Sequence, residues 1–274
     1  MKRNIITVPI QRVDDASASR QQDLLAVEEP LEIRLGERNV AITMRTPGND
    51  AELAAGFLFT EGILRKPSQI ARIMAGQRNT ITIELASGTD VDFDRLERHF
   101  YLTSSCGVCG KASIEKLEAS GCPILPRGQP RIDPTVIHGL PETLRTTQPV
   151  FDRTGGLHAA ALFDAAGQLQ GVREDVGRHN AVDKLIGAEF LEGRQSLNDR
   201  ILMVSGRASF ELVQKALMAG IPVLAAVGAP SSLAVESSLR FGMTLLGFVR
   251  DRRFNIYSGE WRLRGSESTS HPIR

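Results

Sequence analysis

The chain has 274 residues, with 33 Lys and Arg against 32 Asp and Glu, and a formal net charge of +1. This balance gives no general attraction to nucleic acid, and no segment approaches the roughly 18 apolar residues that a membrane span needs. The 3 cysteines are too few for a secreted disulfide framework, and no apolar signal core follows the basic start of the chain. The composition favours a protein of the reducing cytoplasm, without nucleic-acid or membrane partners.

The first part of the chain predicts a small α+β subdomain behind a mobile N-terminal arm. The arm is polar and aperiodic, whereas the segments after it alternate as strands do or carry helix caps. We place the arm at residues 1–28 and the α+β subdomain at residues 29–133. The predicted elements are a hairpin of residues 31–35 and 40–44, a helix from Asn49 to about Gly62, and strands at residues 70–74, 80–85 and 91–93.

The most reactive segment is Cys106-Gly107-Val108-Cys109, on a glycine-rich turn ahead of a predicted helix that ends near Gly121. A helix N-terminus carries partial positive charge and unpaired N–H groups, which favour a thiolate over a thiol. Lys111 adds a cation to the same turn. Cys122 is the only other cysteine, so no second pair completes a four-thiolate site. The pair points to sulfur handling, redox chemistry or a metal site with other ligands.

A proline-rich linker at residues 122–134 separates this part from a second subdomain at residues 134–274. Strands and helices alternate in the second subdomain, which predicts βαβ units and an α/β fold with a mixed, partly parallel sheet. We expect helices on both faces of this sheet. The predicted strands are residues 157–163, 168–173, 201–204, 223–227 and 244–249, and the predicted helices are residues 134–144, 180–191, 209–219 and 231–241.

Two loops between a strand and a helix have the same construction, Ser205-Gly206-Arg207 and Gly228-Ala229-Pro230. Small residues and hydroxyls at a helix N-terminus suit phosphate or another anion. The carboxyl ends of neighbouring parallel strands are also where open α/β sheets bind ligands. Each loop alone is better explained as an ordinary short turn with a serine cap, whereas the two together fit a nucleotide-like ligand as well as they fit two such turns. Further along, Arg250-Asp251-Arg252-Arg253 offers an anion clamp, or else a solvated turn.

Two histidines lie where they can face a pocket. His158 follows two glycines at the start of a predicted strand. His179 belongs to a polar run with Glu174, Asp175 and Arg178, which can form a hydrogen-bonded network or an acid/base pair. The alternative for this run is a helix start capped by Asn180, with surface ion pairs of little energy.

A series of ordered blocks resembles the FdhD family of formate dehydrogenase accessory proteins. The resemblance extends from about residue 29 to residue 257, which is nearly the whole chain. One block is the CxxC turn with Gly110. The others are Thr154-Gly155-Gly156-Leu157-His158-Ala159-Ala160, the run from Glu174 to Lys184, the run from Ser205 to Lys215, Leu233-Ala234-Val235-Glu236 and Thr244-Leu245-Leu246-Gly247-Phe248.

The resemblance implies a sulfur carrier. Such a protein takes sulfane sulfur from a cysteine desulfurase as a persulfide and passes it to the molybdenum of the bis(molybdopterin guanine dinucleotide) cofactor, which then enters formate dehydrogenase. It also implies a homodimer and a second subdomain similar to cytidine deaminases. Where some relatives carry another cysteine, this chain has Gly156. By motif position, Cys106 bears the persulfide and Cys109 is its neighbour. The family's cofactor contacts correspond to Phe248, Val249, Arg250, Asp251, Arg252 and Arg253. To these we add the loop residues Ser205, Gly206 and Arg207 and the two histidines, His158 and His179.

Other uses of the CxxC pair are less consistent with the sequence. A zinc deaminase needs an H-x-E motif and a proline before the CxxC, but no histidine has glutamate two residues later and Ser105 precedes Cys106. We therefore expect no tightly bound zinc. A thiol-disulfide oxidoreductase would place the pair after the first strand of a βαβ unit. The alternative that stays open is a thiol-redox or metal-dependent chaperone that binds the cofactor without transferring sulfur.

Overall fold

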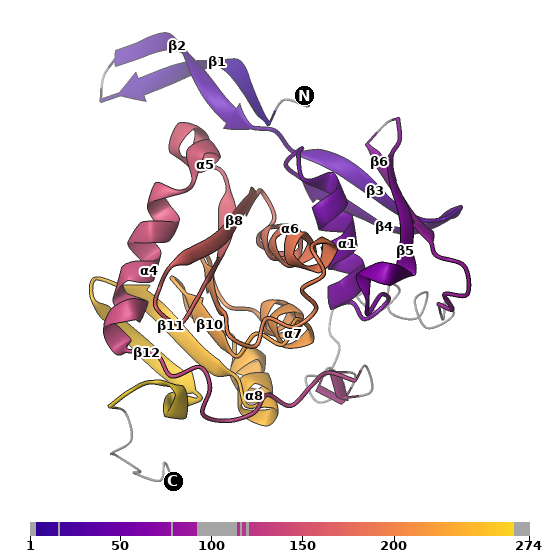
Figure 1. Ribbon diagram of the computed structural model, residues 1–274. Coiled ribbons are helices and arrows are strands. Elements are labelled where there is room, and N and C mark those ends of the chain that lie inside the picture. The colour runs from indigo at the N-terminus through magenta and orange to yellow at the C-terminus, as the bar shows by residue number, and fades with distance from the viewer. Residues whose placement is uncertain are drawn as a thin grey trace.

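The computed structural model describes residues 4–15, 17–77, 79–91, 114–115, 117–118 and 121–265. Two sheets, with helices between and outside them, make up the body, and a two-stranded arm projects from it (Figure 1). None of the described helices is long and apolar enough to cross a membrane. The strands are β1 (Ile5–Asp14), β2 (Ser17–Ala26), β3 (Glu29–Leu35), β4 (Arg38–Arg45), β5 (Ile70–Ala75), β6 (Thr80–Leu85), β7 (His158–Phe163), β8 (Leu169–Asp175), β9 (Ile201–Val204), β10 (Val223–Ala226), β11 (Thr244–Arg250) and β12 (Arg253–Ser258). The α-helices are α1 (Asp50–Thr60), α4 (Pro134–Thr146), α5 (Pro149–Thr154), α6 (Arg178–Leu191), α7 (Phe210–Met218) and α8 (Ser232–Phe241).

The larger sheet has the order β12-β11-β10-β9-β7-β8 and confirms the predicted mixed α/β fold. Strands β9, β10 and β11 are parallel, whereas β7, β8 and β12 run antiparallel to their neighbours. Along β9, Ile201 and Met203 pack in one core with α4, and Leu202 and Val204 pack in a second core with α6, α7 and α8. Successive side chains of a strand point to opposite faces, so helices cover this sheet on both sides, as expected.

The smaller sheet has the order β4-β3-β6-β5 and rests on α1, which in turn crosses α6. The crossing is close because both helices carry glycine there. A Cβ atom on Gly56 would lie 1.9 Å from the Asp183 carbonyl oxygen, and one on Gly187 would lie 1.9 Å from that of Glu52. One core continues from the small sheet across these helices to the large sheet. We call the contact of α1 and the end of β4 with α6 the seam.

The N-terminal arm differs from the expectation. Residues 1–28 read as aperiodic, but β1 and β2 form a regular antiparallel hairpin in which Ile5 lies opposite Ala26 and Asp14 lies opposite Ser17. The arm lies beside α5, and its root is closed by a hydrogen bond from the Val27 N–H to the Asn4 carbonyl. Strand β2 is mostly polar, and β1 carries Ile5, Ile6, Val8, Ile10 and Val13, none of which is buried. The arm therefore buries no face of its own.

The proline-rich linker packs against the large sheet. Leu125 and Ile132 are buried, and the fully buried guanidinium of Arg262 donates hydrogen bonds to the carbonyls of Pro126 and Gln129. Helix α5 and strand β12 were not predicted. Residues 114, 115, 117 and 118 are helical, in agreement with the helix expected after the CxxC turn. The N-cap of α6 is Gly177, so the alternative that made Asn180 the cap is wrong.

Candidate functional site

The two cysteines of the CxxC turn, Cys106 and Cys109, lie outside the described residues. The third cysteine, Cys122, is buried, and this burial raises the pKa of its thiol to about 12. A thiol with so high a pKa carries almost no thiolate at neutral pH, and the thiolate is the nucleophile in sulfur chemistry. Cys122 is therefore a packed thiol rather than a reactive one.

The structure brings His158 and Ser205 together, although they are far apart in the sequence. Strand β7 is antiparallel to β9, so the start of β7 lies at the same sheet edge as the end of β9. The Ala159 N–H donates to Ser205 Oγ at 2.9 Å, and the Ser205 N–H donates to the Ala159 carbonyl at 3.0 Å. A Cβ atom on Gly206 would lie 3.4 Å from His158 Nδ1. We call this place, together with the neighbouring ends of β10 and β11, the strand-end edge.

A cavity of about 430 Å³ opens at the strand-end edge. His158 and Ser205 line it from the sheet, while Phe151 and Arg145 line it from the α4–α5 region. Burial, and after it the positive charge of Arg178, lower the pKa of His158. The imidazole is therefore neutral at pH 7 and can donate a hydrogen bond from one nitrogen and accept one at the other.

The two loops of the strand-end edge hydrogen-bond to each other. The Gly228 N–H donates to the Gly206 carbonyl at 3.0 Å, and the Ala208 N–H donates to the Ala229 carbonyl at 3.2 Å. These two N–H groups are already paired and do not face a ligand. This differs from the sequence analysis, which predicted anion-binding loops here. The Arg207 side chain is exposed. The capacity of this edge for an anion rests mainly on its side chains.

The segment from Phe248 to Arg253 begins at the strand-end edge and ends in an exposed turn. The Phe248 N–H donates to the Gly228 carbonyl at 3.1 Å, which joins the segment to the loops. Val249 is fully buried against the α4 side of the sheet, so its side chain is part of the core. Asp251 and Arg252 adopt left-handed φ angles and form the tight turn between β11 and β12. Arg250, Arg252 and Arg253 are exposed around this turn.

The second predicted histidine, His179, lies apart from the first, in the first turn of α6. Its Nε2 is 3.3 Å from Ser209 Oγ and 3.9 Å from a carboxylate oxygen of Glu211. Burial, followed by the charges of Arg178 and Lys215, lowers the pKa of His179 to about 4. The ring is neutral at pH 7. The polar run thus does more than cap a helix, because it ties α6 to the start of α7.

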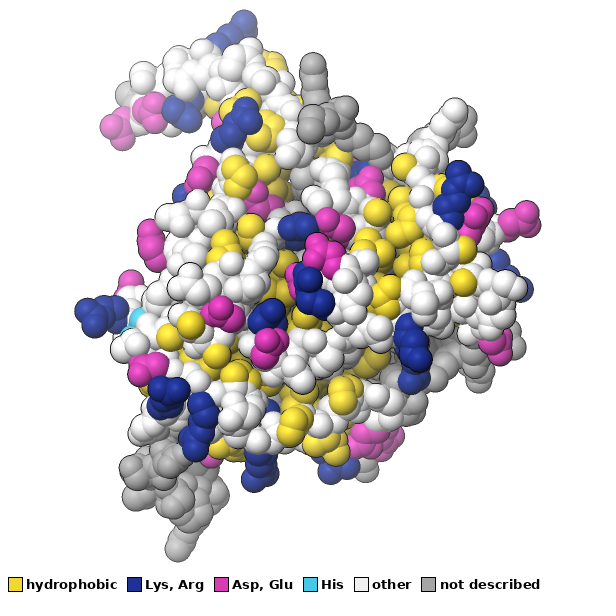
Figure 2. Space-filling model, in the orientation of Figure 1, with side chains coloured by type: hydrophobic (Ala, Val, Ile, Leu, Met, Phe, Trp, Pro, Cys, Tyr) yellow, Lys and Arg dark blue, Asp and Glu magenta, His cyan; other side chains and the backbone are white. Residues whose placement is uncertain are grey.

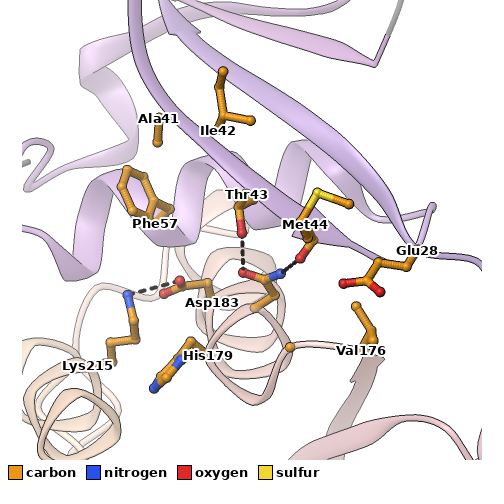
Figure 3. Close-up of a pocket in the computed structure, with 12 residues that line it drawn as sticks. Glu28, Ala41, Ile42, Thr43, Met44, Phe57, Val176, His179, Asp183 and Lys215 are labelled. Atoms are coloured by element: carbon orange, nitrogen blue, oxygen red, sulfur yellow. Dashed lines mark hydrogen bonds and ion pairs between the residues drawn. The ribbon is translucent and has the colours of Figure 1, made fainter. Parts of the chain in front are cut away.

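His179 lines a second cavity, of about 650 Å³, between β4 and the helices α1, α6 and α7 (Figure 3). At its base, Lys215 Nζ lies 2.9 Å from an Asp183 carboxylate oxygen, and Thr60 Oγ1 donates to the same carboxylate at 2.8 Å. Near β4, the Asn180 amide donates to the Met44 carbonyl at 2.7 Å. Sequence reasoning did not single out Lys215 or Thr60, because their partners lie on distant elements. One signal for this cluster was present in the segment of α6, which carries several polar residues that turn out to be buried.

A second buried ion pair lies at the seam. Lys184 Nζ is 2.7 Å from Asp175 Oδ2 and also donates to the Thr46 carbonyl at 2.8 Å. Asp175 accepts further hydrogen bonds from the Thr46 and Gly177 N–H groups. This pair joins β8, α6 and the end of β4, so Asp175 of the polar run and Lys184 of α6 hold the halves of the molecule together.

Comparison with known proteins gives one consistent answer. The profile of the FdhD/NarQ family matches residues 26–264. A sulfur carrier protein FdhD from Streptomyces avermitilis is 50% identical over 262 residues, covering 92% of this chain and 93% of the relative. The protein of the same name from Mycolicibacterium paratuberculosis is 51% identical over 255 residues, covering 88% and 92%. That from Sulfolobus acidocaldarius is 43% identical over 256 residues, covering 93% and 97%.

A solved structure agrees with these relatives. A protein from Desulfotalea psychrophila, described as a formate dehydrogenase accessory protein, superposes with a TM-score of 0.76 at 25% identity, covering 95% of this chain and 100% of that chain. The family match over residues 26–264 includes both sheets, the seam and the strand-end edge. On these grounds the chain belongs to the FdhD/NarQ family.

Proposed function

We propose that this chain is a sulfur carrier that takes sulfane sulfur from a cysteine desulfurase as a persulfide on Cys106. It then passes this sulfur to the molybdenum of the bis(molybdopterin guanine dinucleotide) cofactor that formate dehydrogenase uses. Family membership supports the carrier role, since relatives with 43% to 51% identity are named sulfur carrier proteins. The structural neighbour from Desulfotalea psychrophila favours formate dehydrogenase as the enzyme served.

The observation that carries the choice of cysteine is the state of Cys122. Sulfur uptake needs a thiolate that a partner protein can reach, and Cys122 is buried with its thiol pKa raised to about 12. Among the 3 cysteines, this leaves Cys106 and Cys109. The position of Cys106 as the first cysteine of the CxxC motif supports it as the residue that bears the persulfide.

The first step balances without any added oxidant or reductant. The Cys106 thiolate attacks the outer sulfur of the persulfide on the donor, and a new S–S bond forms to Cys106. The S–S bond of the donor breaks, and its electron pair leaves with the donor cysteine as a thiolate. The sulfane sulfur moves without changing its oxidation state. Cys109 lies three residues away and is suited to tuning its neighbour.

The strand-end edge is the best-supported place for the cofactor. The pyrophosphates and guanines of the cofactor need guanidinium groups and other hydrogen-bonding groups. Arg207 and the arginines of the β11–β12 turn can supply the guanidinium groups. His158 and Ser205 add neutral polar groups at the wall of the 430 Å³ cavity. The anion contacts fall to side chains because several loop N–H groups are already bonded. Binding is therefore expected to weaken with salt, as contacts between exposed charges do.

The test is mass spectrometry of the full chain after incubation with a cysteine desulfurase and cysteine. We expect a mass gain of one sulfur atom on the peptide that contains Cys106, and its loss on treatment with a thiol reductant. Cys106→Ala should abolish the gain and fail to activate formate dehydrogenase, while folding and GDP binding persist. Cys122→Ser is the matched control and should still gain sulfur. A wild-type chain that binds GDP but gains no sulfur would favour the chaperone alternative.

A further inference from the structure

Arg178, the first residue of α6, carries a positive charge that no described residue pairs with. Its side chain is partly buried, and its Nε is buried without a hydrogen-bond acceptor among the described residues. Two other guanidinium groups inside the body have their partners, since Arg45 is paired with Asp50. In the same way, Arg173 is paired with Glu52. A buried donor without an acceptor costs free energy. A ligand that supplies the acceptor would remove this cost.

The start of α6 beside this guanidinium is open as well. Its N-cap, Gly177, has no side chain to accept a hydrogen bond, and the N–H groups of residues 178–180 have no acceptor in the described part of the chain. Helices α4 and α8, by contrast, begin with the side-chain caps Asp133 and Ser231. The first turn of α6 also contains no acidic residue. The unpaired N–H groups at the positive end of the helix therefore add to the charge of Arg178.

Two histidines and one loop lie around this open helix start. His158 lines the cavity of about 430 Å³, and His179 lines the cavity of about 650 Å³. Burial, and after it the charge of Arg178, lower the pKa of both rings, so the guanidinium lies near each of them. At one end of the loop between β9 and α7, Gly206 lies beside His158. At the other end, Ser209 Oγ is 3.3 Å from His179 Nε2. Arg178 therefore lies between the two cavities, near two neutral rings.

The attraction of this place for an anion is local rather than a property of the whole surface. The chain has a formal net charge of only +1. Figure 2 shows Lys and Arg side chains spread over the face in view and interspersed with Asp and Glu. Salt screens exposed charges strongly and partly buried ones much less. Replacement of Arg178 should therefore weaken anion binding far more than replacement of an exposed arginine.

We propose that Arg178 and the open start of α6 form a phosphate-binding site between His158 and His179, and that both rings take up protons when a phosphate binds. A guanidinium holds two phosphate oxygens side by side, and helix N–H groups hold a further one. The choice of phosphate rests on the proposed function, because the cofactor proposed above carries pyrophosphates. The site itself rests on the unpaired donors, which the proposed function does not require.

The proton uptake follows from the charges around the rings. At His158 and at His179 alike, burial and then the charge of Arg178 oppose protonation. A phosphate next to Arg178 offsets that charge and adds its own, which raises the pKa of both rings. By linkage, a ligand that raises these pKa values binds more tightly when the rings are protonated. The other charges that act on the rings are Asp175 on His158, and Lys215, Glu211 and Glu61 on His179.

Glu211 adds an effect of opposite sign. Its carboxylate is 58% exposed, and one oxygen lies 3.9 Å from His179 Nε2. A negative charge here repels a bound phosphate. Removing this charge should therefore tighten phosphate binding, whereas removing the charge of Arg178 should weaken it. A merely structural role for Arg178 predicts no such opposition.

The test is calorimetric titration of the full chain with inorganic pyrophosphate and with GDP. Arg178→Gln should weaken the binding of both by about tenfold or more, because it removes a pair of charge-assisted hydrogen bonds. Glu211→Gln should tighten both by about two- to fivefold. Arg72→Gln removes an exposed arginine of β5 and should change either affinity by less than about twofold. Urea denaturation of each variant checks that it is folded.

NMR of the imidazoles tests the proton uptake. Saturating pyrophosphate should raise the titration midpoints of His158 and His179 by about one pH unit or more in the wild type. In Arg178→Gln, at a pyrophosphate concentration that just saturates the wild type, this rise should be largely lost. A structural role of Arg178 alone would leave both midpoints independent of pyrophosphate.

The two ligands separate this site from the proposed function. Pyrophosphate binding that depends on Arg178, without any binding of GDP, would support the site and count against the nucleotide ligand proposed above. Conversely, GDP binding that Arg178→Gln leaves unchanged would overturn the site and leave the proposed function standing. Midpoints that pyrophosphate does not move, or a wild-type chain that binds neither ligand, would also overturn the site.

Discussion

The seam and the strand-end edge use the same kinds of charged residue in opposite ways. At the seam, Lys184 and Asp175 are almost fully buried and lie 2.7 Å apart, with further hydrogen bonds to backbone groups. At the strand-end edge and the β11–β12 turn that follows it, Arg207, Arg250 and Arg252 are exposed, and none forms an ion pair with any described residue. The charges at the seam are paired with each other inside the protein, whereas the exposed arginines are solvated.

This difference separates charges that hold the fold from charges that are available for a ligand. Burying an ion costs several kcal/mol, which its partner and hydrogen bonds must offset, so removing one partner is expensive. An exposed guanidinium costs little to keep and gains energy only when an anion arrives. Substitutions at the seam should therefore change stability, whereas substitutions among the exposed arginines should change binding.

The largest effect is expected at the buried ion pair of the seam. Lys184→Met leaves the Asp175 carboxylate buried without its cation and should lower the free energy of unfolding by about 3–5 kcal/mol. Urea denaturation measures this directly. Combining Lys184→Met with Asp175→Asn should recover much of the loss, since no unpaired charge then remains. The exposed pair of Arg145 and Asp152 is the control, because Asp152→Asn should cost less than about 1 kcal/mol. Equal losses in the two pairs would contradict the comparison.

A somewhat smaller effect is expected at the helix crossing of the seam. Gly187→Ala places a Cβ atom 1.9 Å from the Glu52 carbonyl oxygen, so α1 and α6 must move apart. We expect a loss of at least about 2 kcal/mol in the free energy of unfolding. Gly139 in α4 is the matched control, because a Cβ atom there meets nothing within 4 Å. Gly139→Ala should stabilise the chain by up to about 1 kcal/mol through helix propensity. A neutral Gly187→Ala would show that the crossing is looser than the structure indicates.

At the β11–β12 turn, the expected change is in binding rather than stability. A triple variant with Arg250→Gln, Arg252→Asn and Arg253→Gln should weaken GDP binding by about tenfold or more, since hydrogen bonds to a charged phosphate contribute about 1.5–3 kcal/mol each. Asparagine tolerates the left-handed φ of residue 252. The free energy of unfolding should change by less than about 0.5 kcal/mol. Calorimetry measures the binding, and a variant lacking the exposed Arg72, Arg194 and Arg240 controls for charge. Unchanged GDP affinity in the triple variant would remove the turn from the site.

The strand-end edge could be predicted from the sequence, because its signals are local. Buried strands of four or five apolar residues, followed by small residues and a helix cap, identify βα turns wherever they occur. Parallel strands then bring such turns to one edge of the sheet. The turn after β9 indicated Ser205 and Gly206, whereas His158 was indicated by the two glycines before its strand. The outward direction of Arg250 and the burial of Val249 needed the actual bend of β11 at Phe248.

The seam could not be predicted, because its signals are long-range. Asp183 lies on a helix, but its partners Lys215 and Thr60 come from α7 and α1. No spacing within one segment reveals such a cluster. The hairpin of the arm was missed for a different reason. Its strands bury no face within one chain, and the alternating hydrophobicity that identifies a strand arises where one face is buried.

The smallest expected effect concerns the pH dependence of stability. Burial, followed by Arg178 and Lys215, lowers the pKa of His179 to about 4, against about 6.5 in the unfolded chain. Between these values the unfolded chain binds a proton that the folded chain does not, so stability falls as the pH drops from about 6.5 to about 4. His179→Gln should make this part of the profile shallower. The ring is about 36% exposed, so solvent screening keeps the change modest.

The His179 titration itself can be followed by NMR of the imidazole. The ring should stay neutral down to about pH 5, and His158 at the strand-end edge should also titrate below its ordinary value. A His179 midpoint near 6.5 would show that the ring lies in water and that the contact with Ser209 is not formed in solution. In that case the polar contact between α6 and α7 at this end would be reduced, among the described residues, to Asp183 with Lys215, and His179 would not help to close the 650 Å³ cavity.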